Sequence, residues 1–134
     1  MAFSDKVRRL ARKLHVRPTD DPDSVTAVLQ IGKRLISEGW TQGVNRAQEP
    51  ETGKVSYCSL GALDAAVPMA APKDAVRTWW AAHRALTGAL PSGFRDIAAH
   101  NDDINTQRED VAAVWHTAGI NQGALNVFVA KGSR

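Results

Sequence analysis

Apolar residues recur at helical spacing through most of the chain, and the pattern is clearest between residues 22 and 37. Asp21 can cap a helix there, Pro22 suits its first position, and Gly39 follows as a stop. Its apolar faces are supplied by Val25, Val28, Leu29, Leu35 and Ile36. We predict a helix over residues 22–37 as the most secure element.

The middle of the chain predicts two more helices. Ser56 or Ser59 can open the first, and Pro68 and Pro72 bracket a break after it. The second covers roughly residues 73–86. Its broad apolar face is expected to hold Val76, Trp79, Trp80, His83 and Leu86.

Capping signals predict two helices nearer the C-terminus. Ser92 can cap a short helix at residues 94–99. Thr106 and Glu109 have the spacing of a capping box, in which a hydroxyl and a carboxylate satisfy each other's backbone donors. The helix that this box opens is expected to end at Gly119.

Two short non-helical runs, at residues 40–45 and 54–57, flank the turn signal at residues 49–53. They predict a β-hairpin. Because an isolated hairpin is only marginally stable, we expect it to lean on the helices or on the β-rich run LNVFV at residues 125–129.

The positive charge is concentrated at the N-terminus. Residues 1–18 carry six basic side chains and one acidic, so the whole-chain excess of +3 comes from this segment. We predict a basic N-terminal helix here, which either packs its apolar stripe against the body or binds phosphates through its charge. The stripe is Val7, Leu10, Ala11 and Leu14, and the candidate phosphate-binding residues are Arg8, Arg9, Arg12 and Lys13.

Length and composition favour one domain, residues 1–134, with the fold of a mainly α, compact bundle of about five to six helices and a small β-hairpin. One cysteine excludes an internal disulfide framework and a zinc site made of thiolates alone. No apolar run approaches the ~18 residues that a membrane span needs. The N-terminus lacks the apolar stretch of a secretory signal, so we expect a cytoplasmic protein.

Cys58 is the first candidate for chemistry, because a thiol at a helix start is favoured as thiolate. With His100 as base and Asp102 behind it, it would form a nucleophilic enzyme. Cysteine is also one of the most buried residue types, and Cys58 lies beside core-forming residues. We favour a packed cysteine and an inert thiol.

The tetrapeptide HNDD at residues 100–103 is the most polar point of an apolar neighbourhood. Asn101 and Asp102 could bind a substrate group or a hard cation. No EF-hand loop or zinc-ligand spacing is present, so we expect a structural turn, with no metal and no cofactor.

Trp79 and Trp80 are adjacent on one predicted helix and therefore point about 100° apart. Both are core residues only if that helix packs on two sides. Otherwise one of them is exposed, as tryptophans at partner-binding surfaces are. Both are therefore candidate binding residues.

Three segments resemble a known family. They are GWTQG at residues 39–43, YCSLGAL at 57–63, and HNDD followed by TQREDV at 100–111. They are similar to motifs of domain of unknown function 6197, a small family of actinobacteria and their phages. The likeness covers residues 22–118 and leaves out the basic N-terminal helix at 1–18 and a C-terminal extension at 119–134.

Two departures from the family pattern are Ser59, where alanine is frequent, and His100, where tryptophan is usual. The second weakens the case for His100 as a catalytic base. The resemblance implies a bacterial or phage setting and transfers no activity.

These observations favour a non-catalytic binding or accessory protein that acts on a host or phage macromolecule, with a protein as the expected partner. One alternative is a small cysteine-dependent enzyme centred on Cys58. Another is a nucleic-acid-binding protein that uses the basic N-terminal helix. The predicted binding residues are Arg8, Arg9, Arg12, Lys13, Trp79, Trp80, Asn101 and Asp102.

Overall fold

The computed structural model describes residues 22–132 and confirms a mainly α bundle with a small hairpin. Within that range lie five helices and two strands, in the order α2 (Pro22–Glu38), β1 (Arg46–Gln48), β2 (Val55–Tyr57), α3 (Ser59–Ala70), α4 (Ala75–Gly88), α5 (Ile97–Asp102) and α6 (Arg108–Gly132). The predicted basic helix lies outside the described residues. No helix within residues 22–132 has the length and apolar character needed to cross a membrane.

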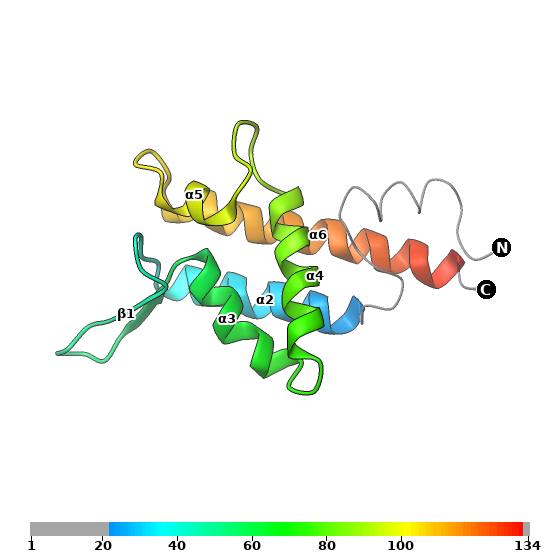
Figure 1. Cartoon of the computed structure of the whole chain (residues 1–134), viewed down its shortest axis with the longest axis horizontal. Coiled ribbons are helices and arrows are strands. Elements are labelled where there is room, and N and C mark those ends of the chain that lie inside the picture. Colours follow the sequence, from blue (N-terminus) through cyan, green and yellow to red (C-terminus); the bar gives the residue numbers. More distant parts are fainter. Residues whose placement is uncertain (1–21, 133–134) are drawn as a thin grey trace.

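Helices α2 and α6 lie side by side and run in opposite directions (Figure 1). Each presents an apolar stripe to the other, which explains why both form helices. Gly32 lies in the contact, and the Trp115 ring occupies the place that a side chain at position 32 would take. The stripes are Val25, Val28, Leu29 and Ile36 on α2, and Val111, Val114, Trp115, Ala118 and Leu125 on α6.

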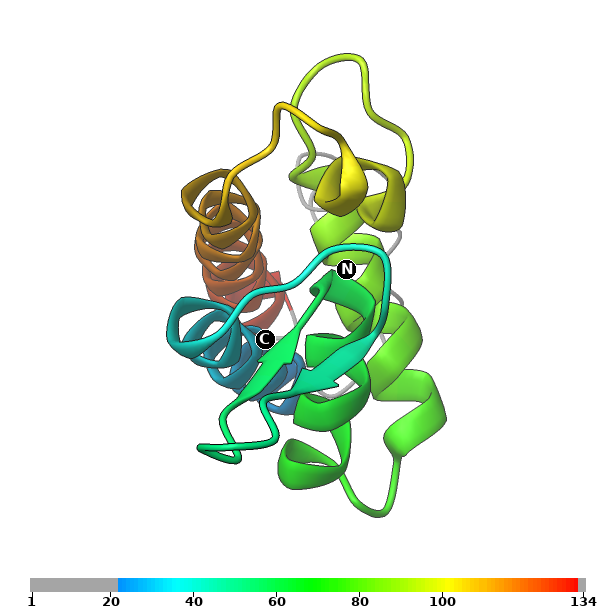
Figure 2. The ribbon, with the colours of Figure 1, turned by 90° about the vertical axis from the view of Figure 1, so that its left-hand side faces the viewer.

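Helices α3 and α4 form the second half of the bundle (Figure 2), and both pack on α2. Helix α4 crosses the α2–α6 pair and contacts both of its members (Figure 1). Its buried face is made mostly of small side chains, which let the helix axes come close. The face consists of Thr78, Ala81, Ala82, Ala85 and Leu86.

The hairpin lies at the end of the bundle where α2 ends and α3 begins. β1 pairs antiparallel with β2, with Arg46 opposite Tyr57. The strand predicted at residues 40–45 is misplaced, because β1 starts only at Arg46 and Trp40 forms an isolated parallel bridge with Tyr57. Residues 40–43 instead contact α5, as described below.

Several predicted helix ends are wrong. Pro68 lies inside α3, which continues to Ala70. Asp96, not Ser92, caps α5, and its Oδ1 accepts the N–H groups of Ala98 at 2.7 Å and Ala99 at 3.4 Å. Helix α5 begins later than predicted and ends later, at Asp102. The HNDD segment is therefore a helix end rather than a free turn.

The start and end of α6 also differ from the prediction. The carboxylate that binds a backbone donor at its start is Asp110, which accepts the Gln107 N–H at 2.8 Å, in place of Glu109. The helix continues past Gly119 because its buried stripe continues to Leu125. The LNVFV run predicted as extended is therefore helical.

Candidate functional site

Asn101 joins the three sequence motifs at one end of the bundle. It is fully buried. Its Oδ1 accepts hydrogen bonds from Trp40 Nε1 at 2.8 Å and from the Ser59 N–H at 3.0 Å. Its Nδ2 donates to the Thr41 carbonyl at 3.1 Å and to Asp102 Oδ1 at 2.9 Å. We call Asn101 and these partners the Asn101 network.

The loop at residues 39–43 closes over α5 through further bonds. Gln42 Nε2 donates to the carbonyls of Asn101 at 2.9 Å and Asp103 at 3.0 Å. The Gly43 N–H donates to Asp102 Oδ1 at 3.0 Å. The side chains expected to bind local amides in a turn thus hold a loop about sixty residues away in sequence. Asn101 and Asp102 have a structural use that accounts for their polarity.

Cys58 is buried, as predicted, and it is the N-cap of α3, a position assigned above to Ser56 or Ser59. Its Sγ accepts the Gly61 N–H at 3.4 Å, and the thiol donates to Asn45 Oδ1 at 3.6 Å. The Asn45 carbonyl lies where a side chain on residue 61 would be. Among the residues that the structure describes, the hydrogen-bond partners of this thiol include no histidine, so the proposed pairing of Cys58 with His100 is not seen.

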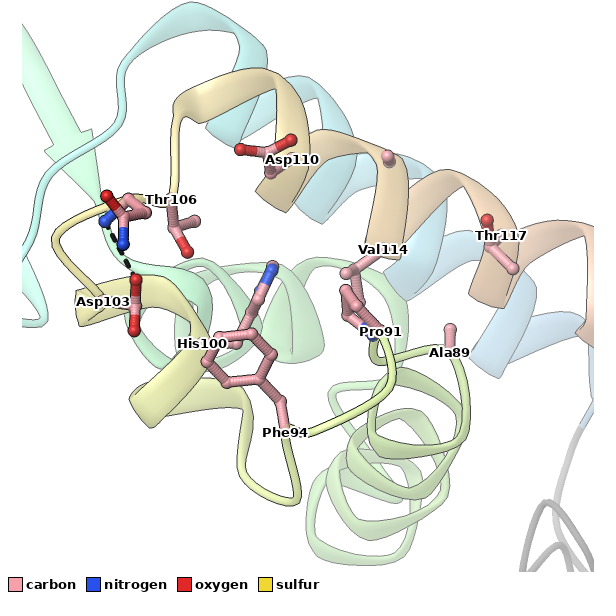
Figure 3. Close-up of a pocket in the computed structure, with 11 residues that line it drawn as sticks. Ala89, Pro91, Phe94, His100, Asp103, Thr106, Asp110, Val114 and Thr117 are labelled. Atoms are coloured by element: carbon pink, nitrogen blue, oxygen red, sulfur yellow. Dashed lines mark hydrogen bonds between the residues drawn. The ribbon is translucent and has the colours of Figure 1, made fainter.

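A pocket of about 420 Å³ opens between α5 and α6 (Figure 3). Its walls come from the α4–α5 connection, from α5, from the α5–α6 connection and from the outer face of α6. Sequence reasoning singled out His100 but did not predict which residues surround it in the pocket. Only the folded structure decides which side of α5 faces the pocket. The polar and aromatic lining residues are Phe94, His100, Asp103, Asn105, Thr106, Asp110 and Thr117.

The His100 side chain extends from α5 toward α6 in this pocket (Figure 3). Only 3% of the residue is exposed, and burial lowers its pKa below 6.5, while Asp110 and Asp103 act in the opposite direction. The edge of its ring meets Phe94 at a centroid distance of 4.9 Å. No hydrogen bond joins its ring nitrogens to a residue in the described part of the chain.

The apolar face predicted for α4 is wrong in part. Leu86 is buried, but Val76 is 74% exposed and Trp80 52% exposed. Trp79 is half-buried and donates its Nε1 hydrogen to Asp64 Oδ1 at 2.8 Å. Ala81, Ala82 and Ala85 take the buried positions instead, because small residues let α4 lie close to the other helices.

Trp80 is held in place by its aromatic neighbours. Its ring meets Trp79 edge-on, with centroids 4.9 Å apart, and Trp79 stacks on His83 at 5.0 Å. Burial lowers the His83 pKa, Asp96 raises it and Arg84 lowers it further. Val76 and Trp80 border two shallow grooves, one beside Pro68 and Trp79, the other beside Arg77 and Arg84. We call Val76 and Trp80, which line both grooves, the α4 patch.

Two candidates remain, a metal site and the basic N-terminal residues. No three histidine, cysteine or acidic side chains in that range are placed to hold a metal ion. Arg8, Arg9, Arg12 and Lys13 lie outside the described residues.

Comparison with known proteins identifies a family. Residues 20–120 match the Family of unknown function (DUF6197), which confirms the resemblance carried by the three motifs. No curated protein and no solved structure matches the chain. The match covers most of the chain and includes the Asn101 network and the whole of the His100 pocket. The chain belongs to the DUF6197 family of unknown function.

Proposed function

We propose that this is a non-catalytic binding protein that takes a protein partner through the α4 patch. The observation that carries the proposal is the exposure of two large apolar side chains that line the same two grooves: 74% for Val76 and 52% for Trp80. Large apolar residues gathered on a surface are typical of interaction sites. Tryptophan in particular is enriched among residues that dominate binding energy.

The patch is suited to binding because part of it is already ordered. Trp79 is fixed by its hydrogen bond to Asp64, and Trp80 packs against it edge-on. A side chain held before binding loses less conformational entropy in the complex. The grooves beside Val76 and Trp80 offer room for apolar side chains of a partner.

Charged residues surround the patch, as they do at the rims of protein interfaces. Asp74 and Arg77 form an ion pair at 4.0 Å in which both side chains are about half exposed. Asp64 and Arg84 line the grooves on either side. Since both signs are present, the surface favours a protein with mixed charges over a uniformly anionic polymer.

The family resemblance suggests where such a partner would be found. Because the motifs resemble those of a family of actinobacteria and their phages, we propose a bacterial or phage protein as the partner and the cytoplasm as the location. The basic N-terminal residues remain the alternative route to a partner, as a nucleic-acid-binding arm. Against the cysteine-enzyme alternative stands the use of the buried Cys58 thiol as a helix cap.

Affinity capture from an actinobacterial lysate with the full chain, followed by measurement of Kd with the purified partner, tests the proposal. We expect the double variant V76S/W80S to weaken binding by at least about tenfold, because it removes the apolar anchors. I120S is the matched control, since Ile120 is 59% exposed, lies on α6 and lines neither groove. Equal loss in the control, or unchanged binding in V76S/W80S, would contradict the α4 patch.

The nucleic-acid alternative has its own measurement. A variant with Arg8, Arg9, Arg12 and Lys13 changed to glutamine should leave protein capture unchanged if the α4 patch is the interface. If the arm is the interface instead, wild-type binding to DNA or RNA falls steeply as salt is raised, and this variant loses it.

A further inference from the structure

We propose that the His100 pocket binds a small organic cation, a compact molecule with an ammonium or guanidinium group and an apolar body. The site is separate from the α4 patch and does not depend on the function proposed for it. The inference rests on the size of the pocket, the unpaired histidine inside it, the charge of its lining and its apolar wall.

The pocket has the size of a ligand site. Its volume of about 420 Å³ falls in the range of roughly 300–1,000 Å³ found for small-molecule sites. Three different segments form it, the α4–α5 connection, α5 with the turn after it, and α6 (Figure 3). The convergence of polar groups from several segments on one apolar space is typical of such sites.

His100 supplies the second observation. Buried polar groups are normally hydrogen-bonded to the protein, so a largely buried ring without such a partner keeps its bonding capacity for water or a ligand. The His100 ring lines the pocket, is 3% exposed, and finds no hydrogen-bond partner within residues 22–132. Its neighbour Asn101, by contrast, uses both polar atoms of its side chain. The His100 nitrogens are therefore available to a bound molecule.

The charge of the lining selects a cation. Asp103 and Asp110 face the pocket, and no lysine or arginine is among the lining residues that the structure describes. One oxygen of each carboxylate already accepts a backbone N–H, from Asn105 at 2.9 Å and from Gln107 at 2.8 Å. The other oxygen of each accepts no hydrogen bond from a residue that the structure describes. A neutral imidazole beside two carboxylates offers acceptors to an ammonium or guanidinium group.

The apolar wall favours an organic cation over a metal ion. The hydrocarbon part of a ligand can lie against Pro91, Phe94 and Val114. The Phe94 ring can also attract a cation placed over its face. The described residues include no metal-holding group of three side chains here or elsewhere.

Three molecules of similar shape distinguish binding that depends on charge from binding that depends on shape alone. They are benzylamine, benzyl alcohol and benzoate. We would titrate each into the full chain and follow backbone amide resonances by NMR, with phenylguanidine as a second cation. We expect saturable shifts at residues 94–117 with both cations, and at least about tenfold weaker responses with the alcohol and the benzoate, because the carboxylates attract only the cations. Equal responses to all the probes, or no shifts at residues 94–117 with either cation, would overturn the proposal.

Matched variants locate the charge. D103N and D110N keep the oxygen that accepts the backbone N–H and remove the charge, so each should weaken benzylamine binding by several-fold and the pair by more. E109Q is the control, since it removes the same charge from the same turn of α6 at a residue that does not line the pocket. Thermal melts check that every variant is folded. Equal weakening in E109Q would show a general charge effect and overturn the pocket assignment.

The titration of His100 gives a measurement that binding in a purely apolar pocket would not change. A cation bound beside the ring opposes its protonation, so saturation with benzylamine should move the titration midpoint of the His100 Cε1–H resonance to lower pH. Asp103 and Asp110, which face the ring, are the groups that favour its protonated form. An unchanged midpoint at saturation would place the cation outside the pocket. V76S/W80S should bind benzylamine as the wild type does, which keeps this test distinct from that of the α4 patch.

Discussion

His100 and Asn101 are consecutive residues at the end of α5, both almost fully buried, and they differ in how their polar atoms are used. The Asn101 amide makes four hydrogen bonds, three of which join α5 to the 39–43 loop and to the start of α3. The His100 ring makes no hydrogen bond with the described residues and faces a pocket. A saturated polar group can stabilise a fold, whereas an unsaturated one lowers stability unless something binds it.

Polar residues that hold the fold together and polar residues that are available to a ligand are therefore different residues in this protein. The three sequence motifs attract notice because they are polar and aromatic, yet they meet in the Asn101 network, where they hold the fold together. The groups available to another molecule lie next to that network, around His100, or away from it, at the apolar α4 patch.

The comparison is tested most directly by truncating Asn101. We expect N101A to lower the free energy of unfolding by about 3–4 kcal/mol, because it leaves the Ser59 N–H and the Trp40 Nε1 hydrogen without their acceptor. Urea unfolding measures the change. The substitution H100Q at the neighbouring residue should lower the free energy of unfolding by less than about 1 kcal/mol, since no hydrogen bond to a described residue is lost. Similar losses in the two variants would break the comparison.

The packing within the motif region gives the second prediction. G61A should destabilise the protein by about 2–3 kcal/mol, because the new methyl group meets the Asn45 carbonyl, which is backbone and cannot rotate away. G119A is the control, as no atom lies within 4 Å of the added carbon. There the change should stabilise α6 by up to about 1 kcal/mol through helix propensity alone. A G61A protein as stable as the wild type would show that the loop does not lie against α3.

Cys58 tests whether the motif region holds a reactive group. C58A should lower the free energy of unfolding by about 1 kcal/mol, because it removes the sulfur that accepts the Gly61 N–H. In the native protein, iodoacetamide should label Cys58 slowly, and only denaturant should speed the reaction, since the thiol is buried. Fast native labelling near pH 6 would revive the cysteine-enzyme hypothesis.

The sequence predicted those parts of the fold that depend on local signals. Pro22 and Gly39 bound α2 closely, because a proline start and a glycine stop act on the residues beside them. The 40–45 run was misread because Trp40 and Gln42 bind α5, about sixty residues away. Gly119 did not end α6, because long-range burial of Leu125 outweighs the local cost of a glycine.

The candidate sites were predicted less well, for a related reason. Asn101, Asp102 and Trp80 were chosen for their chemistry, but only packing decides which of them remain available. On α4, alanines took the interior positions and left Trp80 outside. The pocket residues Asp110 and Thr117 carry no sequence signal, because they lie on the outer face of an ordinary amphipathic helix.

The smallest effect expected concerns the dependence of stability on pH. Burial lowers the pKa values of His100 and His83 in the folded protein, whereas both take the ordinary value of 6.5 when it is unfolded. As the pH falls through 6.5, the unfolded state therefore binds protons first. The stability that comes from the two neutral rings is fully present above pH 6.5 and is lost as the pH falls toward their lower pKa values in the folded protein. Asp110 and Asp103 beside His100, and Asp96 beside His83, reduce the loss without cancelling it, while Arg84 adds to it at His83.

Urea unfolding at pH 7.5 and pH 5.5 measures this loss in the wild type, in H100Q and in H83Q/H100Q. Each substitution removes one histidine whose protonation favours the unfolded state, so the decrease in stability between the two pH values should become smaller in H100Q and smaller again in the double variant. A decrease of the same size in all three proteins would mean that neither ring is desolvated. The folded protein would then stabilise the proton of the His100 ring as well as water does, and the contrast with Asn101 would no longer hold.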